Sequence, residues 1–123
     1  MGRRFFGFCF ALLLMLAAPA AFAAEVIDSF ASDIALEKSG AMTVTETITV
    51  NAEGNQINHG IFRDFPLYFT DAAGRRRSVD FDMVSVQRDG DNEPWHTESI
   101  SGGIRIYAGS ADVTVTPGRH RYV

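Results

Sequence analysis

The sequence predicts an all-β protein, an antiparallel β-sandwich-like domain that follows a signal peptide. Three observations support this fold class. No helical period of apolar residues is present after Ala24, short runs of alternating apolar and polar residues take its place, and Gly, Pro, Asn and Asp separate these runs. Residues 24–123 number 100, which is enough for one domain with a modest hydrophobic core.

Residues 1–23 have the organisation of an export signal, with a basic start, an apolar run over residues 5–18 and small residues at the end. Residues 21–23 match the A-x-A cleavage pattern, so we expect cleavage between Ala23 and Ala24. The apolar run is shorter than the roughly 20 residues that a membrane-spanning helix needs. An uncleaved membrane anchor is the alternative interpretation.

Charge and cysteine content argue against several classes of protein. Cleavage removes Arg3 and Arg4 and moves the net charge from −4 to −6, and an acidic domain is a poor candidate for binding nucleic acid. The single cysteine, Cys9, lies inside the export signal, so the expected mature chain has no disulfide framework. The sequence contains no Gly-rich phosphate loop and no G-x-S-x-G motif, and we expect no cofactor.

The first two expected strands, residues 26–36 and 42–50, form a hairpin whose register is selected by the apolar pattern. A three-residue loop over residues 38–40 pairs Leu36 with Met42 and puts the apolar residues of both strands on one face. A two-residue loop would set apolar residues against polar ones. The longer loop also places a glycine where such hairpins need a left-handed residue.

Glu46 interrupts the apolar face of the second strand, where it lies opposite Ser32 in the selected register. A lone buried carboxylate is costly or becomes protonated. We therefore predict a structural ion pair between Glu46 and Arg63, because a guanidinium can meet a carboxylate in two parallel hydrogen bonds. The alternative is a solvated glutamate at an open sheet edge, and a catalytic role is disfavoured.

The rest of the chain divides into further short strands. Pro66 marks its segment as an edge strand or a strand end, and residues 71–77 are expected to form a loop. Pro117 and Gly118 predict a type II turn between the last two strands. Because the final strand has no turn after it, we expect the sequence to be the front part of a longer protein. Strands are expected at residues 61–69, 78–87, 95–100, 104–109, 112–116 and 119–123.

In their order and spacing, the segments MTVTETITV, GIFRDFP, VSVQRDG, IRIYAG and TPGRHRYV resemble the N-terminal region of the domain of unknown function 2207 family, a group of predicted membrane proteins. The resemblance covers nearly all of residues 1–123. It implies an extracytoplasmic β-sandwich-like domain that is followed by transmembrane helices beyond residue 123. It implies no established activity.

Acidic residues gather in the second half of the chain, and part of this cluster, DGDNE, has the composition of a calcium loop. It lacks the twelve-residue spacing and the terminal glutamate of an EF-hand. We interpret it as a polar hairpin turn in which Gly90 supplies the positive φ, with a weak calcium site as the alternative. The acidic residues concerned are Asp80, Asp82, Asp89, Asp91 and Glu93.

Other candidate side chains have plain structural interpretations. The histidines His59, His96 and His120 show no metal-ligand spacing. Residues 75–77, three arginines, can contact anionic lipid but are interpreted as a solvated loop tip. Four aromatic residues can line a sugar or peptide groove, although core packing is the expectation. They are Tyr68, Phe69, Trp95 and Tyr107.

These observations together predict an exported or membrane-tethered binding or interaction module, not an enzyme, on the periplasmic face of the inner membrane or at the cell surface. Its expected partners are the membrane, through the downstream helices, and another protein. One alternative is a hydrolase, which a convergent pocket around Asp80, Asp82 and His96 would favour. The other is a structural spacer for the membrane part, and an exposed aromatic groove would favour binding over both.

Overall fold

The computed structural model describes residues 25–123, which form antiparallel strands and, within this range, no helix. The all-β prediction is therefore confirmed. The expected signal peptide and its cleavage site between Ala23 and Ala24 lie outside the described residues. The strands are β1 (Val26–Leu36), β2 (Met42–Ala52), β3 (Gly60–Pro66), β4 (Tyr68–Thr70), β5 (Arg76–Ser78), β6 (Gln87–Arg88), β7 (Asp91–Asn92), β8 (Trp95–Ile100), β9 (Gly103–Gly109) and β10 (Gly118–Tyr122).

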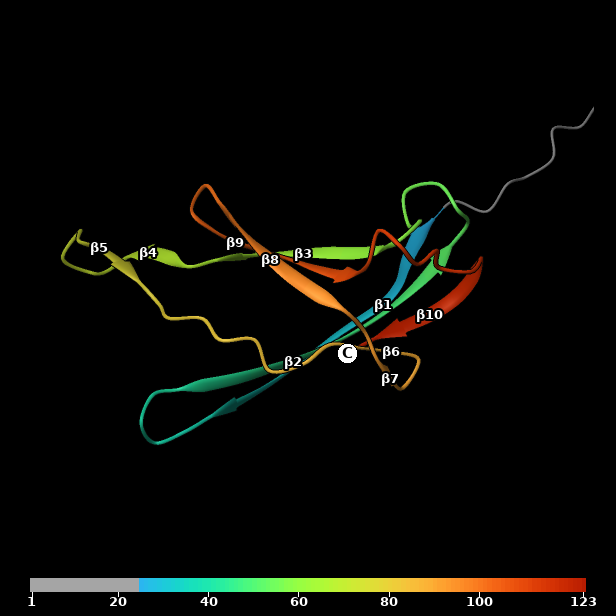
Figure 1. Ribbon diagram of the computed structural model, residues 1–123. Helices are drawn as coiled ribbons and strands as arrows, with labels where there is room; N and C mark the ends of the chain where they lie inside the picture. The colour runs from blue at the N-terminus through green and yellow to red at the C-terminus, as the bar shows by residue number, and fades with distance from the viewer. Residues whose placement is uncertain (1–24) are drawn as a thin grey trace, which may run out of the picture.

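Two main sheets face each other, as in a sandwich (Figure 1). The larger sheet has the strand order β1-β2-β10-β6-β7, and the smaller has the order β3-β9-β8. A separate hairpin of β4 and β5 extends the layer that contains β3. In Figure 1 this small hairpin and the tip of the β1–β2 hairpin project toward the same side of the molecule. The sandwich is thus closed at one end and open at the other.

The β1–β2 register is the one that the apolar pattern selects. Leu36 pairs with Met42, and Ser32 lies opposite Glu46. The N–H of Glu37 donates to the carbonyl of Ala41 (2.9 Å), which closes the three-residue loop. The glycine of that loop has a φ of 90°, the left-handed conformation that a three-residue hairpin requires.

A small hydrophobic core lies between the two main sheets at the closed end. Its residues are far apart in the chain and come from the neighbouring strands β2 and β10 of the larger sheet, from β9 of the smaller sheet and from the segment before β6. Burial raises the pKa of Tyr122 to about 12, and its hydroxyl has no hydrogen-bond partner among residues 25–123. The core residues are Ile48, Val50, Val86, Ala108 and Tyr122, with Ile57, Ile61 and Met83 packed against them.

Burial declines steadily along the apolar face of β2. Val50 is 1% exposed and Ile48 is 7% exposed, whereas Val44 and Met42 are 42% and 62% exposed. The neighbouring strand β1 of the same sheet is exposed along its whole length. The apolar pattern therefore predicts which way the side chains point but not how far they are covered, because the smaller sheet extends over only the base of this hairpin.

Three local expectations are wrong. The strand expected at residues 78–87 is not formed, since residues 79–86 pair with no other strand in the described part of the chain. The loop expected at residues 71–77 ends early, because β5 begins at Arg76 and pairs with β4. Residues 112–116 form no strand, and the turn at Pro117 does not join two paired strands.

The last of these errors has a clear physical cause. β10 pairs with β2 and, through Tyr122, with β6, so its hydrogen-bonding edges are both used by strands distant in sequence. Val115 is instead buried against the loop before β3, where its N–H donates to the carbonyl of Asn58 (2.8 Å). Pairing of β10 with the central strand β2 is more favourable than a local hairpin with residues 112–116, because that pairing also buries His120 and Tyr122.

Candidate functional site

A groove of about 660 Å³ lies between β1 of the larger sheet and β3 of the smaller sheet. Its volume falls in the range of about 300–1,000 Å³ that is typical of ligand sites. Glu25, Arg63 and Asp64 contribute the charged groups. The apolar lining consists of Val26, Ile27, Phe30, Ile48, Val50, Ile57, Ile61 and Phe62.

Both strands that border the groove are edge strands. β1 has only β2 beside it, and β3 has only β9 beside it, among the described residues. An edge strand presents unpaired backbone N–H and C=O groups, which can accept another extended segment. The groove therefore combines an apolar lining with backbone groups that are free to pair.

The structure brings Glu46 and Arg63 together across the two sheets. Nε of Arg63 donates to Oε2 of Glu46 (2.9 Å), and Nη2 donates to Oε1 (2.9 Å). This two-point geometry is the strongest form of a carboxylate–guanidinium contact. The glutamate side chain is 14% exposed, but the arginine is 41% exposed. The pair is thus half-buried at the groove wall.

Two aromatic rings hold the Arg63 guanidinium in place. Its central carbon lies 5.3 Å from the ring centroid of Phe30 and 4.8 Å from that of Phe65. Attraction between the cation and the ring faces adds to the ion pair and fixes the plane of the guanidinium. Since Phe30 comes from β1 and Phe65 from β3, the same arginine contacts both walls.

Glu25 is held by a loop of backbone donors. Its Oε1 accepts hydrogen bonds from the N–H groups of Glu53 (2.9 Å) and Asn55 (2.7 Å). Its Oε2 accepts from Gln56 (2.6 Å) and Ile57 (2.8 Å). Desolvation acts to raise the pKa of Glu25, but the four backbone donors outweigh it and lower the pKa to about 2. The carboxylate therefore ties the start of β1 to the loop before β3.

Sequence reasoning did not find Glu25. A single glutamate beside a polar loop carries no pattern, and its four partners are backbone groups, which every residue type presents. The only signal was the composition of residues 53–57, where the loop residues Gly54 and Asn55 favour turns that can gather successive N–H groups around an anion. Gly54 has a φ of 77°.

The outer face of the smaller sheet carries a row of rings and a row of charges. Phe62, Tyr107 and His96 lie opposite one another on three adjacent strands, and His96 stacks on Tyr107 with centroids 4.6 Å apart. In the next row Arg105 donates to both carboxylate oxygens of Asp64 (2.7 and 2.8 Å). Hydrogen bonding to Arg105 lowers the pKa of Asp64.

The expectation that four aromatic residues fill the core is wrong for all of them. Tyr68, Phe69 and Trp95 are exposed, and Tyr107 is half-buried on the outer face. A domain with such a small core encloses small aliphatic side chains most completely, and Val50 and Val115 are its largest fully buried residues.

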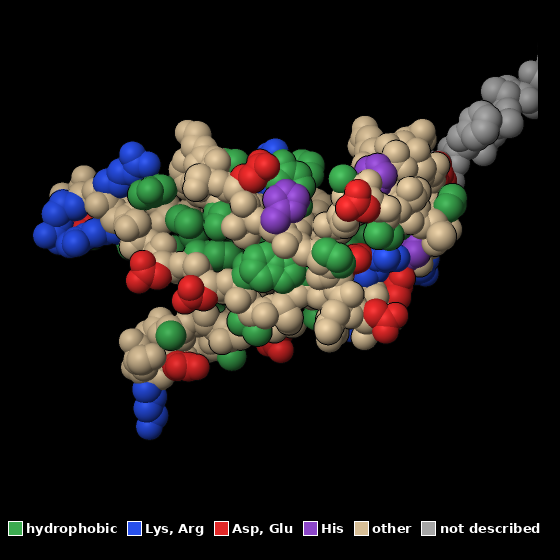
Figure 2. Space-filling model, viewed as in Figure 1, with side chains coloured by type: hydrophobic (Ala, Val, Ile, Leu, Met, Phe, Trp, Pro, Cys, Tyr) green, Lys and Arg blue, Asp and Glu red, His purple; other side chains and the backbone are tan. Residues whose placement is uncertain are grey.

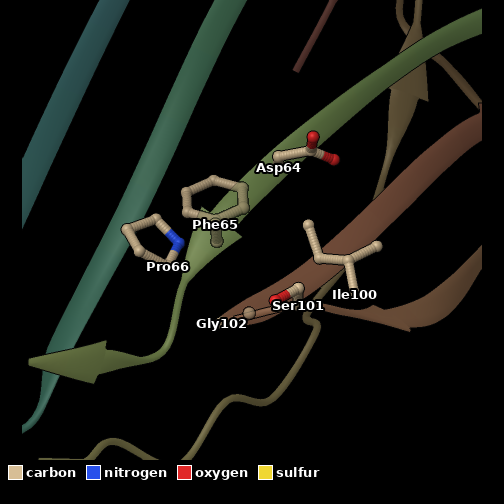
Figure 3. Close-up of a pocket in the computed structure, with 7 residues that line it drawn as sticks. Asp64, Phe65, Pro66, Ile100, Ser101 and Gly102 are labelled. Atoms are coloured by element: carbon tan, nitrogen blue, oxygen red, sulfur yellow. The ribbon is translucent and has the colours of Figure 1, made fainter.

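A second, smaller hollow lies at the end of the smaller sheet, where β8 turns into β9 (Figure 3). Asp64, Phe65 and Pro66 form one side, and the turn from Ile100 to Gly103 forms the other. Its one carboxylate is already bound by Arg105. The only charged residue that lines the hollow is thus already paired, and the groove is the better candidate for a binding site.

The acidic cluster does not form a single site. The segment DGDNE makes a tight hairpin between β6 and β7 in which Asp89 and Gly90 have φ of 53° and 89°, so the predicted polar turn is confirmed. Glu93 is bound by Arg88. Asp89 is bound by His120 (2.6 Å), and this contact lowers its pKa. No three metal-ligating side chains gather anywhere in residues 25–123.

None of the residues that would support a hydrolase, Asp80, Asp82 and His96, lines the groove or the smaller hollow. Asp80 and Asp82 are exposed on the segment before β6, whereas His96 stacks on a tyrosine of the smaller sheet. His59 is exposed, as expected, and lies 3.0 Å from the carbonyl of Val113. In the arginine cluster, Arg75 and Arg77 both bind Asp71. This carboxylate organises the β4–β5 turn.

Residues 26–123 match a family described as predicted membrane protein (DUF2207), N-terminal domain. The chain belongs to the DUF2207 family. It is 31% identical over 98 residues to the uncharacterized protein YciQ of Escherichia coli (strain K12), a match that covers 80% of this chain and 16% of the relative. The DUF2207 domain described here thus spans about a sixth of that relative. No solved structure matches it.

The helices expected after residue 123 fall outside the described DUF2207 domain. Within residues 25–123, no helix is long and apolar enough to cross a membrane. The family is one of predicted membrane proteins.

Substitution of either partner tests the Glu46–Arg63 pair. Because the pair is half-buried, Glu46→Ala and Arg63→Ala should each lower the free energy of unfolding by about 1–2 kcal/mol, less than the roughly 3–5 kcal/mol of a fully buried pair. The double variant should lose about 1 kcal/mol less than the sum of the two. Denaturant melts of the four proteins measure this coupling, and strictly additive losses would contradict it.

The Glu25 contact predicts a dependence of stability on pH. The pKa of Glu25 is lower in the folded chain than its ordinary value of 4.5, so its contribution is complete above that pH and is lost as the pH falls toward 2. Glu25→Gln should lower the melting temperature at pH 7, and its difference from the parent should shrink between about pH 4.5 and 2. Glu37→Gln, at an exposed turn, is the control and should show neither effect.

Proposed function

We propose that this domain is a non-enzymatic interaction module, exported and tethered to a membrane, which faces the periplasm or the cell exterior. The groove between β1 and β3 is its binding site, and its ligand is an extended, apolar segment of a protein partner. One observation carries this proposal, namely an apolar groove bordered by two edge strands whose outer backbone groups have no strand neighbour in residues 25–123.

The groove suits an extended polypeptide better than a small polar molecule. A peptide that lies along β1 or β3 can make backbone hydrogen bonds with the edge, while its alternate side chains enter the apolar groove. Apolar side chains of the groove are exposed and available for such contact, since Ile27 is 64% exposed and Phe30 is 48% exposed. A charged peptide group can approach the exposed part of Arg63.

The chemistry of the groove also favours binding over hydrolysis. A general base needs a pKa near the working pH and a free lone pair. The carboxylate of Glu25 is occupied by four N–H donors, and those of Glu46 and Asp64 are each held by an arginine. All three carboxylates near the groove are therefore engaged in holding the structure together.

The location is supported by the family and by the export signal. The family consists of predicted membrane proteins, and the first 23 residues have the organisation of a signal peptide.

Expression with a C-terminal tag should give a mature protein that begins at Ala24 and is found outside the cytoplasm. N-terminal sequencing of each cell fraction checks this, and a soluble cytoplasmic product that begins at Met1 would contradict it.

A charge placed in the groove should abolish peptide binding. The probe is a labelled ten-residue peptide of alternating valine and threonine, titrated with the full-length protein in detergent. Ile27→Asp should raise the Kd at least about tenfold, which corresponds to roughly 1.4 kcal/mol. Val113→Asp places the same charge at an exposed valine outside the groove and should leave the Kd within about twofold. No binding by the parent protein, or equal binding by both variants, would contradict the proposal.

A further inference from the structure

The two halves of β2 have different surroundings. From Ile48 to Ala52, β2 lies between two strands, with β1 on one side and β10 on the other. From Met42 to Thr47 it pairs with β1 alone. Within residues 25–123, the second edge of this half of β2 therefore has no strand beside it.

The direction of the backbone groups on that free edge follows from the hairpin register. In an antiparallel ladder, alternate residues direct both backbone groups toward the same neighbour. The N–H of Glu37 donates to the carbonyl of Ala41, so these two residues form a hydrogen-bonded pair of the ladder. The odd-numbered residues of β2 therefore direct their backbone N–H and C=O groups toward β1. The N–H and C=O groups of Met42, Val44 and Glu46 consequently point toward the free edge.

The side chains of the same stretch are also uncovered. Met42 and Val44 are 62% and 42% exposed, although they continue the face on which Ile48 and Val50 are buried. In Figure 2 the tip of the β1–β2 hairpin projects away from the rest of the molecule, and a gap separates it from the layer above. This part of β2 therefore has no strand paired along its second edge among the described residues, and its apolar face is uncovered.

A slot for one strand lies next to this edge. The final pair of the larger sheet joins Val123 and Gln87, which exchange two backbone hydrogen bonds (2.8 and 3.0 Å). Before Gln87 comes the segment 79–86, whose residues pair with no strand in the described part of the chain. A strand that continued β10 beyond Val123 in the same register would have β2 on one side and residues 79–86 on the other. This space is the slot.

We propose that the slot is filled by a continuation of β10, formed by the residues that follow Val123 in the full-length protein. The register with β2 fixes the positions. Since Tyr122 pairs with Ile48, the first, third and fifth residues after Val123 lie opposite Glu46, Val44 and Met42. Their side chains point inward, as those of His120 and Tyr122 do, so the third and fifth are apolar.

The same polypeptide is a better occupant than a second copy of the chain. β10 already lies between β2 and β6, so its extension needs no loop closure and loses no translational freedom. The relative YciQ is about six times as long as the matched region, which is consistent with further chain beyond this region. This inference is independent of the proposed groove, which lies at β1 and β3.

Disulfide trapping in the full-length protein tests the register. The only cysteine of the sequence, Cys9, lies in the expected signal, and any downstream cysteines are replaced first. Val44→Cys is combined with a cysteine at the third residue after Val123. Directly paired residues of this kind have Cα atoms about 5.5 Å apart, within the range of about 4.4–6.8 Å that disulfides accept. An intramolecular disulfide should form in most molecules.

The matched control combines Thr45→Cys with the same second cysteine. Because the side chain of Thr45 points to the opposite face of the sheet, this variant should form less than a tenth as much disulfide. Equal trapping in both variants, no trapping in either, or a disulfide between two copies would overturn the proposal. Hydrogen exchange in the unmodified full-length protein gives a second measurement. The amides of Val44 and Glu46 should be as protected as that of Val50, and rapid exchange at both would also overturn it.

Discussion

The contact between Glu46 and Arg63 is the constraint on which the arrangement of the two sheets depends. No disulfide can join the sheets, because the sequence has a single cysteine, and the shared hydrophobic core is small. A carboxylate on β2 and a guanidinium on β3 therefore fix the distance between the layers at one point, through two hydrogen bonds. Phe30 and Phe65 flank the guanidinium and limit its rotation. Arg63, one partner in this contact, also lines the groove between β1 and β3.

Carboxylates serve as structural ties throughout the domain. Glu25 holds the loop before β3 through backbone donors, Asp71 organises the β4–β5 turn, and Asp89 joins the β6–β7 turn to β10. Glu25 and Asp71 accept hydrogen bonds from N–H groups that a turn leaves without partners, whereas Asp89 accepts from the N–H of the strand residue Arg121. An acidic composition thus has a use in a domain that contains many tight turns. It also leaves these carboxylates poorly suited to act as bases.

The domain is well packed at one end and open at the other. Near Val50 the two sheets enclose apolar side chains, whereas toward Met42 the side chains on the same face of β2 are exposed. Long exposed apolar edges promote association with other chains, so natural proteins cover or protect them. The two open features, the groove along β1 and the free edge of β2, are therefore the places where the proposed peptide ligand and the proposed continuation of β10 would pair.

The sequence by itself determined the strand class, the β1–β2 register, the turn at Gly90 and the choice of Arg63 as a partner for Glu46. These follow from local rules, since a period of two places side chains on faces and a buried charge needs an opposite charge. Only the tertiary structure decided that β10 pairs with β2 rather than with residues 112–116, that Glu25 is bound by four backbone groups, and that Trp95 and Val44 are exposed. Strand partners and burial depend on which segments compete for the same edge or cover the same face. That competition involves residues far apart in the chain, and no local pattern records it.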